Sequence, residues 1–179
     1  CNHGQSGFGS YITNVVSNLP ADLIQINKDA VTINADTAPS SETTQERKLK
    51  AQVELFGIEE DRYVYTSGKA LNYVSTPMIA NLKAERMWHK HKITKFIKKN
   101  EYDAVVYPAA CRVLPSKFKN HTGVAIINSI LSADFENESA SFKRHILKSL
   151  KNIQIIIAST IFIKDDLISL GIDAKKIKV

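Results

Sequence analysis

The feature that most constrains this chain is the alternation of apolar strands and helices in its second half. Residues 153–159, IQIIIAS, are mostly apolar, as in a strand buried on both faces of a sheet. Strands that alternate with helices form βαβ units, whose strands are parallel. The elements expected here are strands at 103–108, 123–130, 153–159 and 176–179, and helices at 139–152 and 160–171. The pattern predicts an α/β fold with a Rossmann-like, doubly wound, mostly parallel sheet and helices on both faces.

The first half of the chain has a weaker pattern of the same kind. Apolar residues at three- and four-residue spacing predict a helix at 9–19, which Pro20 ends. A second helix is expected at 46–57, with Gly57 at its end, and a long third one at 77–100, with Pro77 in its first turn. Short strands are expected at 22–28, 31–34 and 62–66. The small polar residues at about 35–45 predict a mobile loop.

Length and composition indicate one globular domain that spans residues 1–179. The chain is 44% hydrophobic and 23% charged, which is ordinary for a protein with a buried core. Its longest apolar stretch, residues 153–163, is shorter than the roughly 20 residues of a membrane span. Cys1 and Cys111 are too few for a disulfide framework and lack the spacing of a zinc site. We therefore expect reduced thiols and a cytoplasmic location.

The positive charge of the chain is concentrated in the helix expected at 77–100. The formal net charge is +6, and residues 81–100 hold seven Lys or Arg against a single acidic residue, Glu85. Apolar residues form one stripe of this helix, with most lysines on the other side. One interpretation is a solvated face over a core helix. The other is a peripheral contact with anionic lipids at the inner membrane face, with Met87 and Trp88 at the interface. The lysines of this second interpretation are Lys90, Lys92, Lys95, Lys98 and Lys99.

Nucleic acid is the least favoured partner of this basic helix, and a metal site is not expected. Apart from Trp88 there is little aromatic interleaving, and no nucleic-acid-binding module is evident. His89 and His91 are two residues apart, so on a helix they point to different faces and are poor partners for one metal ion. The acidic residues that follow the strand at 123–130 are expected to form a solvated loop; they are Asp134, Glu136 and Glu138.

Three of the seven glycines lie in GQSGFGSYI, residues 4–12, directly before the first helix. A glycine-rich turn that enters a helix offers phosphates its backbone N–H groups and the positive end of the helix dipole. The stretch lacks the Gly-Lys-Ser/Thr ending of a P-loop. Ile12 stands where a dinucleotide fingerprint has its third glycine, which counts against an oxidoreductase with a nucleotide cofactor. From the residues alone, a phosphate or substrate loop and a plain tight turn both remain open.

The two ends of the chain resemble the N-terminal domain of family 4 glycosyltransferases, which have the GT-B fold. SGFGSYITNVVSNLP, residues 6–20, is similar to the loop and first helix of that domain, roughly small-Gly-apolar-Gly-x-Tyr-apolar and then a helix ending in Leu-Pro. Residues 152–179 resemble its last segment, in which a strand ends in serine and a Gly-Ile/Val-x-x-x-Lys-Ile-x-Val run follows. Residues 101–109 and 123–136 fall between them in the expected order. The resemblance covers most of the chain in outline.

This resemblance implies one acceptor-side domain of a GT-B pair, inactive as this fragment alone. A second Rossmann-like domain would follow it and hold most of the donor. The whole enzyme would be a retaining hexosyltransferase that needs no metal and no cofactor. It would transfer a sugar from a nucleotide-sugar, such as a UDP- or GDP-sugar, to a glycan or lipid-linked acceptor. The implied donor-phosphate loop consists of Gly7, Phe8, Gly9 and Ser10.

The chain departs from the family pattern where the acceptor is expected to bind. Many members carry His-Asp after the strand that aligns with residues 124–127, whereas this chain has Asn128 and Ser129. An amide and a hydroxyl can hydrogen-bond a sugar but cannot act as a charged pair. Ser159 ends the strand at 153–159, and it either caps the next helix, which is our prediction, or lines the cleft with Asn128 and Ser129. No catalytic residue is assigned. The alternative function is a non-catalytic Rossmann-like domain that binds a partner or an anionic membrane surface.

Overall fold

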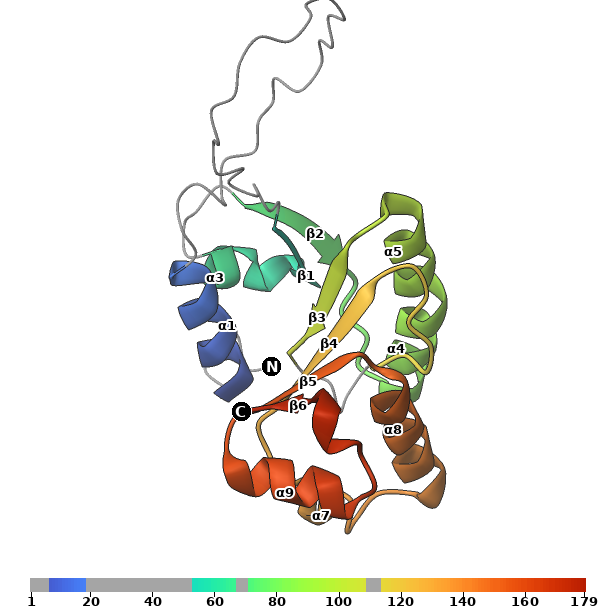
Figure 1. Ribbon diagram of the computed structural model, residues 1–179. Helices are drawn as coiled ribbons and strands as arrows, with labels where there is room; N and C mark the ends of the chain where they lie inside the picture. The colour runs from blue at the N-terminus through green and yellow to red at the C-terminus, as the bar shows by residue number, and fades with distance from the viewer. Residues whose placement is uncertain (1–6, 19–52, 67–70, 109–113) are drawn as a thin grey trace, which may run out of the picture. The chain divides into compact units, whose positions relative to one another are not determined.

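The computed structural model describes residues 7–18, 53–66, 71–108 and 114–179, and it is an α/β structure of parallel sheets and helices (Figure 1). The chain divides into two compact units, Cys1–Met78 and Ile79–Val179. Each unit has its own parallel sheet. The Rossmann-like α/β expectation is confirmed at this level.

The first unit pairs two short parallel strands and packs two helices together. In chain order its elements are α1 (Gly7–Ser17), β1 (Glu54–Ile58), a 3-10 turn (Glu59–Asp61), α3 (Arg62–Thr66) and β2 (Asn72–Thr76). The two strands run side by side, with Leu55 opposite Tyr73 and Ile58 opposite Thr76. Helix α1 contacts α3.

Two sequence predictions in this unit are wrong. Residues 54–57, expected to end a helix, belong to β1, and residues 62–66, expected as a strand, form α3. Gly57 lies within β1, where the Tyr73 side chain packs against its backbone. A Cβ at this position would collide with the Tyr73 hydroxyl, which explains why glycine occupies it. The aromatic and β-branched residues of α3 become helical because Tyr65 and Thr66 are buried there, and such tertiary packing overrides strand propensity. The predictions for 22–28, 31–34, 35–45 and 46–52 lie outside the described residues.

The second unit is built on a four-stranded parallel sheet in the order β3-β4-β5-β6. Its strands are β3 (Ala104–Tyr107), β4 (Thr122–Ile127), β5 (Ile155–Ala158) and β6 (Ile177–Lys178). The register pairs Val106 with Val124, and Ile127 with Ala158. All four strands were predicted from the sequence, and helices lie on both sides of this sheet (Figure 1). The two faces of β5 are not equally buried, since Ile156 and Ala158 are buried whereas Ile155 is 37% exposed.

The helices of the second unit begin in two ways, some at a side-chain cap from the preceding residue and others without one. They are α4 (Leu82–Trp88), a π-helical turn (His89–Ile93), α5 (Thr94–Asn100), α7 (Leu131–Asp134), α8 (Ala140–Asn152), α9 (Ile161–Ser169) and a 3-10 turn (Ala174–Lys176). The Asn81 side chain accepts hydrogen bonds from the backbone N–H groups of Lys83 and Ala84, which starts the long helix at Leu82 and not at Pro77. Ser139 caps α8 through the N–H of Phe142.

The hydrophobic core of the second unit lies between the central strands and the flanking helices. Its fully buried members include Ala125, Ile127, Leu150, Ile153, Ile156 and Leu167. Gly123, in β4, marks the closest approach, since a Cβ there would lie 2.6 Å from the Phe118 ring and 2.9 Å from the Ile153 side chain. Its N–H donates to Gln154 Oε1 at 2.8 Å. A side chain at this position would force apart the start of β4 and the segment that enters β5.

Candidate binding site at the carboxyl edge of the sheet

The carboxyl ends of β4 and β5 bring together Asn128, Ser129 and Ser159, the residues considered for the acceptor side of a cleft. Ile127 and Ala158, the last residues of these strands, are register partners. The Ser159 N–H also donates to the Ile127 carbonyl at 3.1 Å, so the pairing continues one residue beyond β5. Asn128 and Ser129, which follow β4, therefore lie next to Ser159, which follows β5. Asn128 and Ser129 are half-buried, and Ser159 is exposed. This edge of a parallel sheet is where open α/β domains bind ligands.

A carboxylate joins this group from α7. The Ser129 hydroxyl donates to Asp134 Oδ2 at 2.5 Å, a short and charge-assisted hydrogen bond. Asp134 is the last residue of this one-turn helix, and its side chain is exposed. Asp134 was expected in a solvated acidic loop, because no sequence pattern indicates a helix as short as the four-residue α7.

Asp166, on α9, fixes the start of α7. Its Oδ2 atom accepts hydrogen bonds from the backbone N–H groups of Leu131 and Ser132, at 2.8 and 3.1 Å. These N–H groups begin a helix and have no carbonyl partner within it, so the carboxylate satisfies them. Asp166 thereby positions the segment that carries Ser129 and Asp134. The sequence gives no signal for this contact, which joins residues about 35 positions apart.

The predicted capping role of Ser159 is wrong, because Thr160 caps α9. Thr160 has an extended backbone, and its Oγ1 atom accepts from the Ile163 N–H at 3.3 Å. Ser159 lies one residue too early for this bond. Its exposed hydroxyl lies at the carboxyl edge, which is the other role considered for it.

The residues of the expected donor-phosphate loop lie in the first unit. Gly7, Phe8, Gly9 and Ser10 form the first turn of α1, so the helix begins two residues earlier than predicted. Gly4, which opens the glycine-rich stretch, is outside the described residues. The backbone N–H groups of such a first turn have no carbonyl partner within the helix and point along its axis, which is the chemistry that phosphate binding requires.

Of the apolar stripe predicted for the long basic helix, Ile93, Phe96 and Ile97 are at least half-buried, whereas Ile79, also expected in it, lies before the helix begins at Leu82. Ile97 is buried, and Ile93 and Phe96 are half-buried, while Met87 is 62% exposed. Trp88 is half-buried, and its ring meets the ring of His89 edge-on at 5.3 Å. The lysines proposed for a membrane surface, Lys90, Lys92, Lys95, Lys98 and Lys99, are all exposed.

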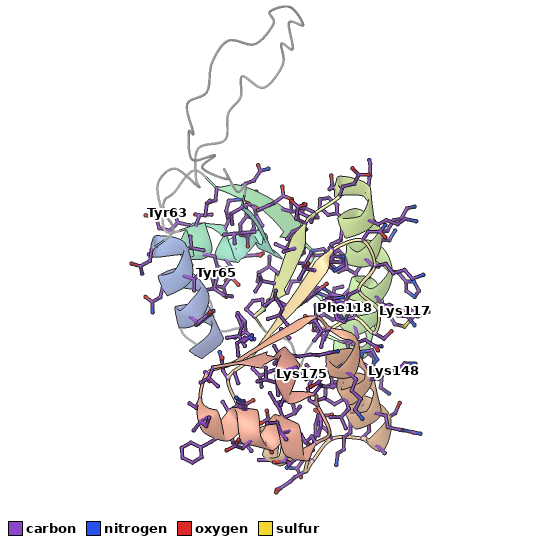
Figure 2. The ribbon with its side chains drawn as sticks, in the orientation of Figure 1. Tyr63, Tyr65, Lys117, Phe118, Lys148 and Lys175 are labelled. Atoms are coloured by element: carbon purple, nitrogen blue, oxygen red, sulfur yellow. The ribbon has the colours of Figure 1, made fainter. Side chains whose placement is uncertain are left out.

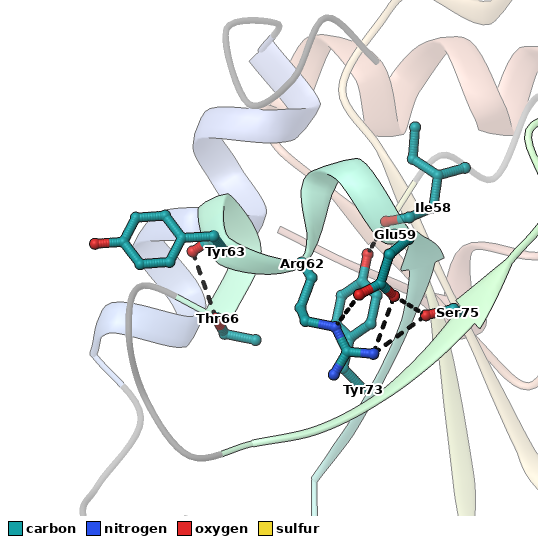
Figure 3. A network of polar contacts seen from close by, with 7 residues as sticks. All are labelled: Ile58, Glu59, Arg62, Tyr63, Thr66, Tyr73 and Ser75. Carbon is teal, nitrogen blue, oxygen red and sulfur yellow. Dashed lines mark hydrogen bonds and ion pairs between the residues drawn. The ribbon is translucent and has the colours of Figure 1, made fainter.

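A polar network that the sequence did not reveal lies in the first unit (Figure 3). Arg62 donates to both carboxylate oxygens of Glu59, at 2.7 and 3.0 Å, and Ser75 donates to the same carboxylate. The bond from Arg62, and then that from Ser75, holds the pKa of Glu59 below its usual value. The Arg62 guanidinium also lies 5.0 Å from the centre of the Tyr73 ring, and the Tyr73 hydroxyl donates to the Ile58 carbonyl at 2.7 Å. These contacts tie the turn after β1 to β2, which is a structural role.

Two tyrosines titrate at unusually high pH. Burial raises the pKa of Tyr73 to about 12, and the nearby negative charge of Asp61 adds to the shift. Burial alone raises the pKa of Tyr107, at the end of β3. Both phenols therefore stay protonated at neutral pH, and neither is poised as a base.

The described part of the chain holds no group of three or more His, Cys, Asp or Glu side chains that could bind a metal ion. Among the same residues, no helix has both the length and the apolar character needed to cross a membrane.

Comparisons with protein-family models, with curated proteins and with solved structures found no match to this chain. The assignment of a function therefore depends on the site geometry and on the motifs at the two ends of the sequence.

Proposed function

We propose that this chain is the acceptor-binding N-terminal domain of a retaining glycosyltransferase of the GT-B type. The observation that carries the proposal is the grouping of Asn128, Ser129, Asp134 and Ser159 at the carboxyl edge of β4 and β5. The Rossmann-like architecture and the motifs at residues 6–20 and 152–179 support the same assignment.

The chemistry of the edge residues suits a sugar acceptor. Sugar hydroxyls both donate and accept hydrogen bonds, and the Asn128 amide can do both. The Ser129 hydroxyl donates its hydrogen bond to Asp134, so the Ser129 oxygen can accept a hydrogen bond from a ligand hydroxyl. The second carboxylate oxygen of Asp134 adds a charged acceptor, in a chain that lacks the His-Asp pair of many family members. In this proposal Asp134 orients the acceptor hydroxyl, and no residue is assigned as catalytic.

The donor side of the reaction needs no resident cofactor or metal in this proposal. The donor would be a nucleotide-sugar, such as a UDP- or GDP-sugar, held mainly by a second Rossmann-like domain. The first turn of α1, with Gly7 and Gly9, would contribute backbone N–H groups to the diphosphate. The acceptor would be a glycan or a lipid-linked sugar.

The acceptor site is tested by titrating the isotope-labelled chain with a panel of mono- and oligosaccharides and following its amide NMR signals. We expect shifts at residues 128–134 and 159–160 with at least one sugar. Asn128→Ala combined with Ser129→Ala should abolish these shifts. Ser132→Ala is the matched control, because its exposed side chain lies on α7 beside the site, and this variant should bind as the parent does. Shifts confined to other parts of the chain, or none with any sugar, would favour the non-catalytic alternative.

A further inference from the structure

The charges of the second unit are segregated onto particular helices. The helix formed by α4, the π turn and α5, together with α8, carries eleven Lys or Arg and one acidic residue, Glu85. The other two helices have the opposite character, since α7 ends in Asp134 and α9 carries Asp165 and Asp166 with one lysine. The sequence had shown the basic run at 81–100 alone, whereas the structure adds α8 to it.

The two basic helices contact one another and make one surface. The Arg86 guanidinium, on α4, lies 3.7 Å from the centre of the Phe142 ring in the first turn of α8. Figure 1 shows α4, α5 and α8 on the same side of the sheet, and Figure 2 labels Lys148 on α8. We call this surface the α5–α8 basic face. Its exposed lysines are Lys83, Lys90, Lys92, Lys95, Lys98, Lys99, Lys148 and Lys151.

The exposed charge of this face comes almost entirely from lysine. Both arginines already have contacts within the protein, Arg86 with Phe142 and Arg144 through its Nε atom with the Ala140 carbonyl at 3.3 Å. Lysine is a flexible point charge, whereas reading of nucleic-acid bases relies on the planar, two-pronged guanidinium and on exposed aromatic rings. The tryptophan of this face, Trp88, is half-buried against His89. The exposed charge of this face is therefore suited to a dense array of phosphate charges.

We infer that the α5–α8 basic face binds the anionic headgroups of a membrane surface. Eight exposed lysines on two adjoining helices match a surface of many negative charges, where each lysine adds attraction that is screened by salt. Met87, exposed on the same helix, adds an apolar side chain that can enter the headgroup layer. The inference goes beyond the proposed transferase activity and does not depend on it.

Vesicle flotation of the whole chain tests this inference. With phosphatidylcholine vesicles that contain 30% phosphatidylserine, we expect recruitment at 0.1 M salt and loss of recruitment at 1 M salt. Lys95→Gln combined with Lys98→Gln should weaken the affinity for vesicles about 25-fold, since each lysine contributes about five-fold. Lys175→Gln combined with Lys178→Gln removes the same charge from exposed lysines elsewhere in the unit and should change the affinity less than three-fold.

Three outcomes would overturn the inference. The first is a failure of anionic vesicles to recruit the chain at 0.1 M salt. The second is an equal loss of affinity in the two double variants, which would show a net-charge effect with no defined face. The third is tighter binding to a mixed-sequence oligonucleotide than to the vesicles, which would assign the face to nucleic acid. Circular dichroism of each variant confirms that the helices are retained.

Discussion

At the scale of single residues, two glycines lie where a neighbouring side chain packs directly against the backbone. Gly57 lies under the Tyr73 ring, and Gly123 faces Phe118 and Ile153. In each case the glycine is required by close approach and not by an unusual backbone angle. An added methyl group at either position would collide with a neighbouring side chain and displace it from its packed position.

Gly57→Ala should lower the free energy of unfolding by about 1–3 kcal/mol. The new methyl group would meet the Tyr73 hydroxyl and break its 2.7 Å hydrogen bond to the Ile58 carbonyl. Urea denaturation measures the loss. In a Tyr73→Ala background the clash is gone, so the same substitution should cost clearly less. An equal cost in both backgrounds would contradict the proposed contact.

The stability of the chain should depend on pH between about 10 and 12. The pKa of Tyr73 is about 12 in the folded chain, against an ordinary value of 10.0. Between these values the folded state keeps a proton that the unfolded state loses, so the free energy of unfolding falls as pH rises. Below pH 10 the contribution of this phenol to stability is fully present. Denaturation at several pH values should show a shallower fall in Tyr73→Phe, whereas an unchanged slope would contradict the raised pKa.

At the scale of secondary-structure elements, contacts between side chains and backbone N–H groups set where helices begin. Asn81, Ser139 and Thr160 cap α4, α8 and α9 from the preceding residue. Helix α7 is different, because the carboxylate that satisfies its first N–H groups comes from Asp166 on another helix. The short α7 therefore depends on tertiary structure for its position.

Asp166→Ala should destabilise the chain by about 1.5–3 kcal/mol, because it leaves the N–H groups of Leu131 and Ser132 without their charged acceptor. It should also weaken any ligand binding at Ser129 and Asp134, which α7 carries. Asp165→Ala removes the adjacent exposed carboxylate and is the matched control. Thermal and chemical denaturation of the two variants provides the comparison. Equal effects would show that the charge of α9 matters and the bond to α7 does not.

The sequence predicts elements well where periodicity and local caps decide them. Helix α8 was expected at 139–152 and begins after the Ser139 cap, and β5 was expected from its apolar run. The predictions failed at 54–57 and 62–66, where the Tyr73 ring over Gly57 and the burial of α3 decide the structure. Asn128 and Ser129 were selected through the resemblance to the glycosyltransferase family, since the strand expected at 123–130 ran past them, whereas β4 ends at Ile127.

The partners that organise this edge were not predictable. The bond from Ser129 to Asp134 depends on the one-turn α7, and α7 depends on Asp166 from a distant helix. Pairings of this kind arise from the packing of α9 beside α7, for which no local pattern exists. The same holds for the contact of Arg86 with Phe142, which extends the basic run of the sequence onto α8.

At the scale of the whole molecule, the proposed acceptor site and the proposed lipid-binding surface lie in different parts of the second unit. The proposed acceptor site occupies the carboxyl edge of β4 and β5, while the proposed lipid-binding surface is the outer face of α4, α5 and α8. They share no residue, so each can be tested with variants that leave the residues of the other unchanged. Vesicle binding without sugar binding, or the reverse, would therefore separate the two proposals.

Turnover of nucleotide-sugars by the natural full-length protein that carries this chain tests the central claim most directly. We predict release of UDP or GDP from at least one nucleotide-sugar in the presence of its acceptor, with retention of the anomeric configuration. Ser129→Ala combined with Asp134→Ala should lower kcat/KM at least about ten-fold, as expected when hydrogen bonds to a substrate are lost, whereas Ser132→Ala should leave it unchanged. A protein that releases no nucleoside diphosphate from any UDP- or GDP-sugar would contradict the account.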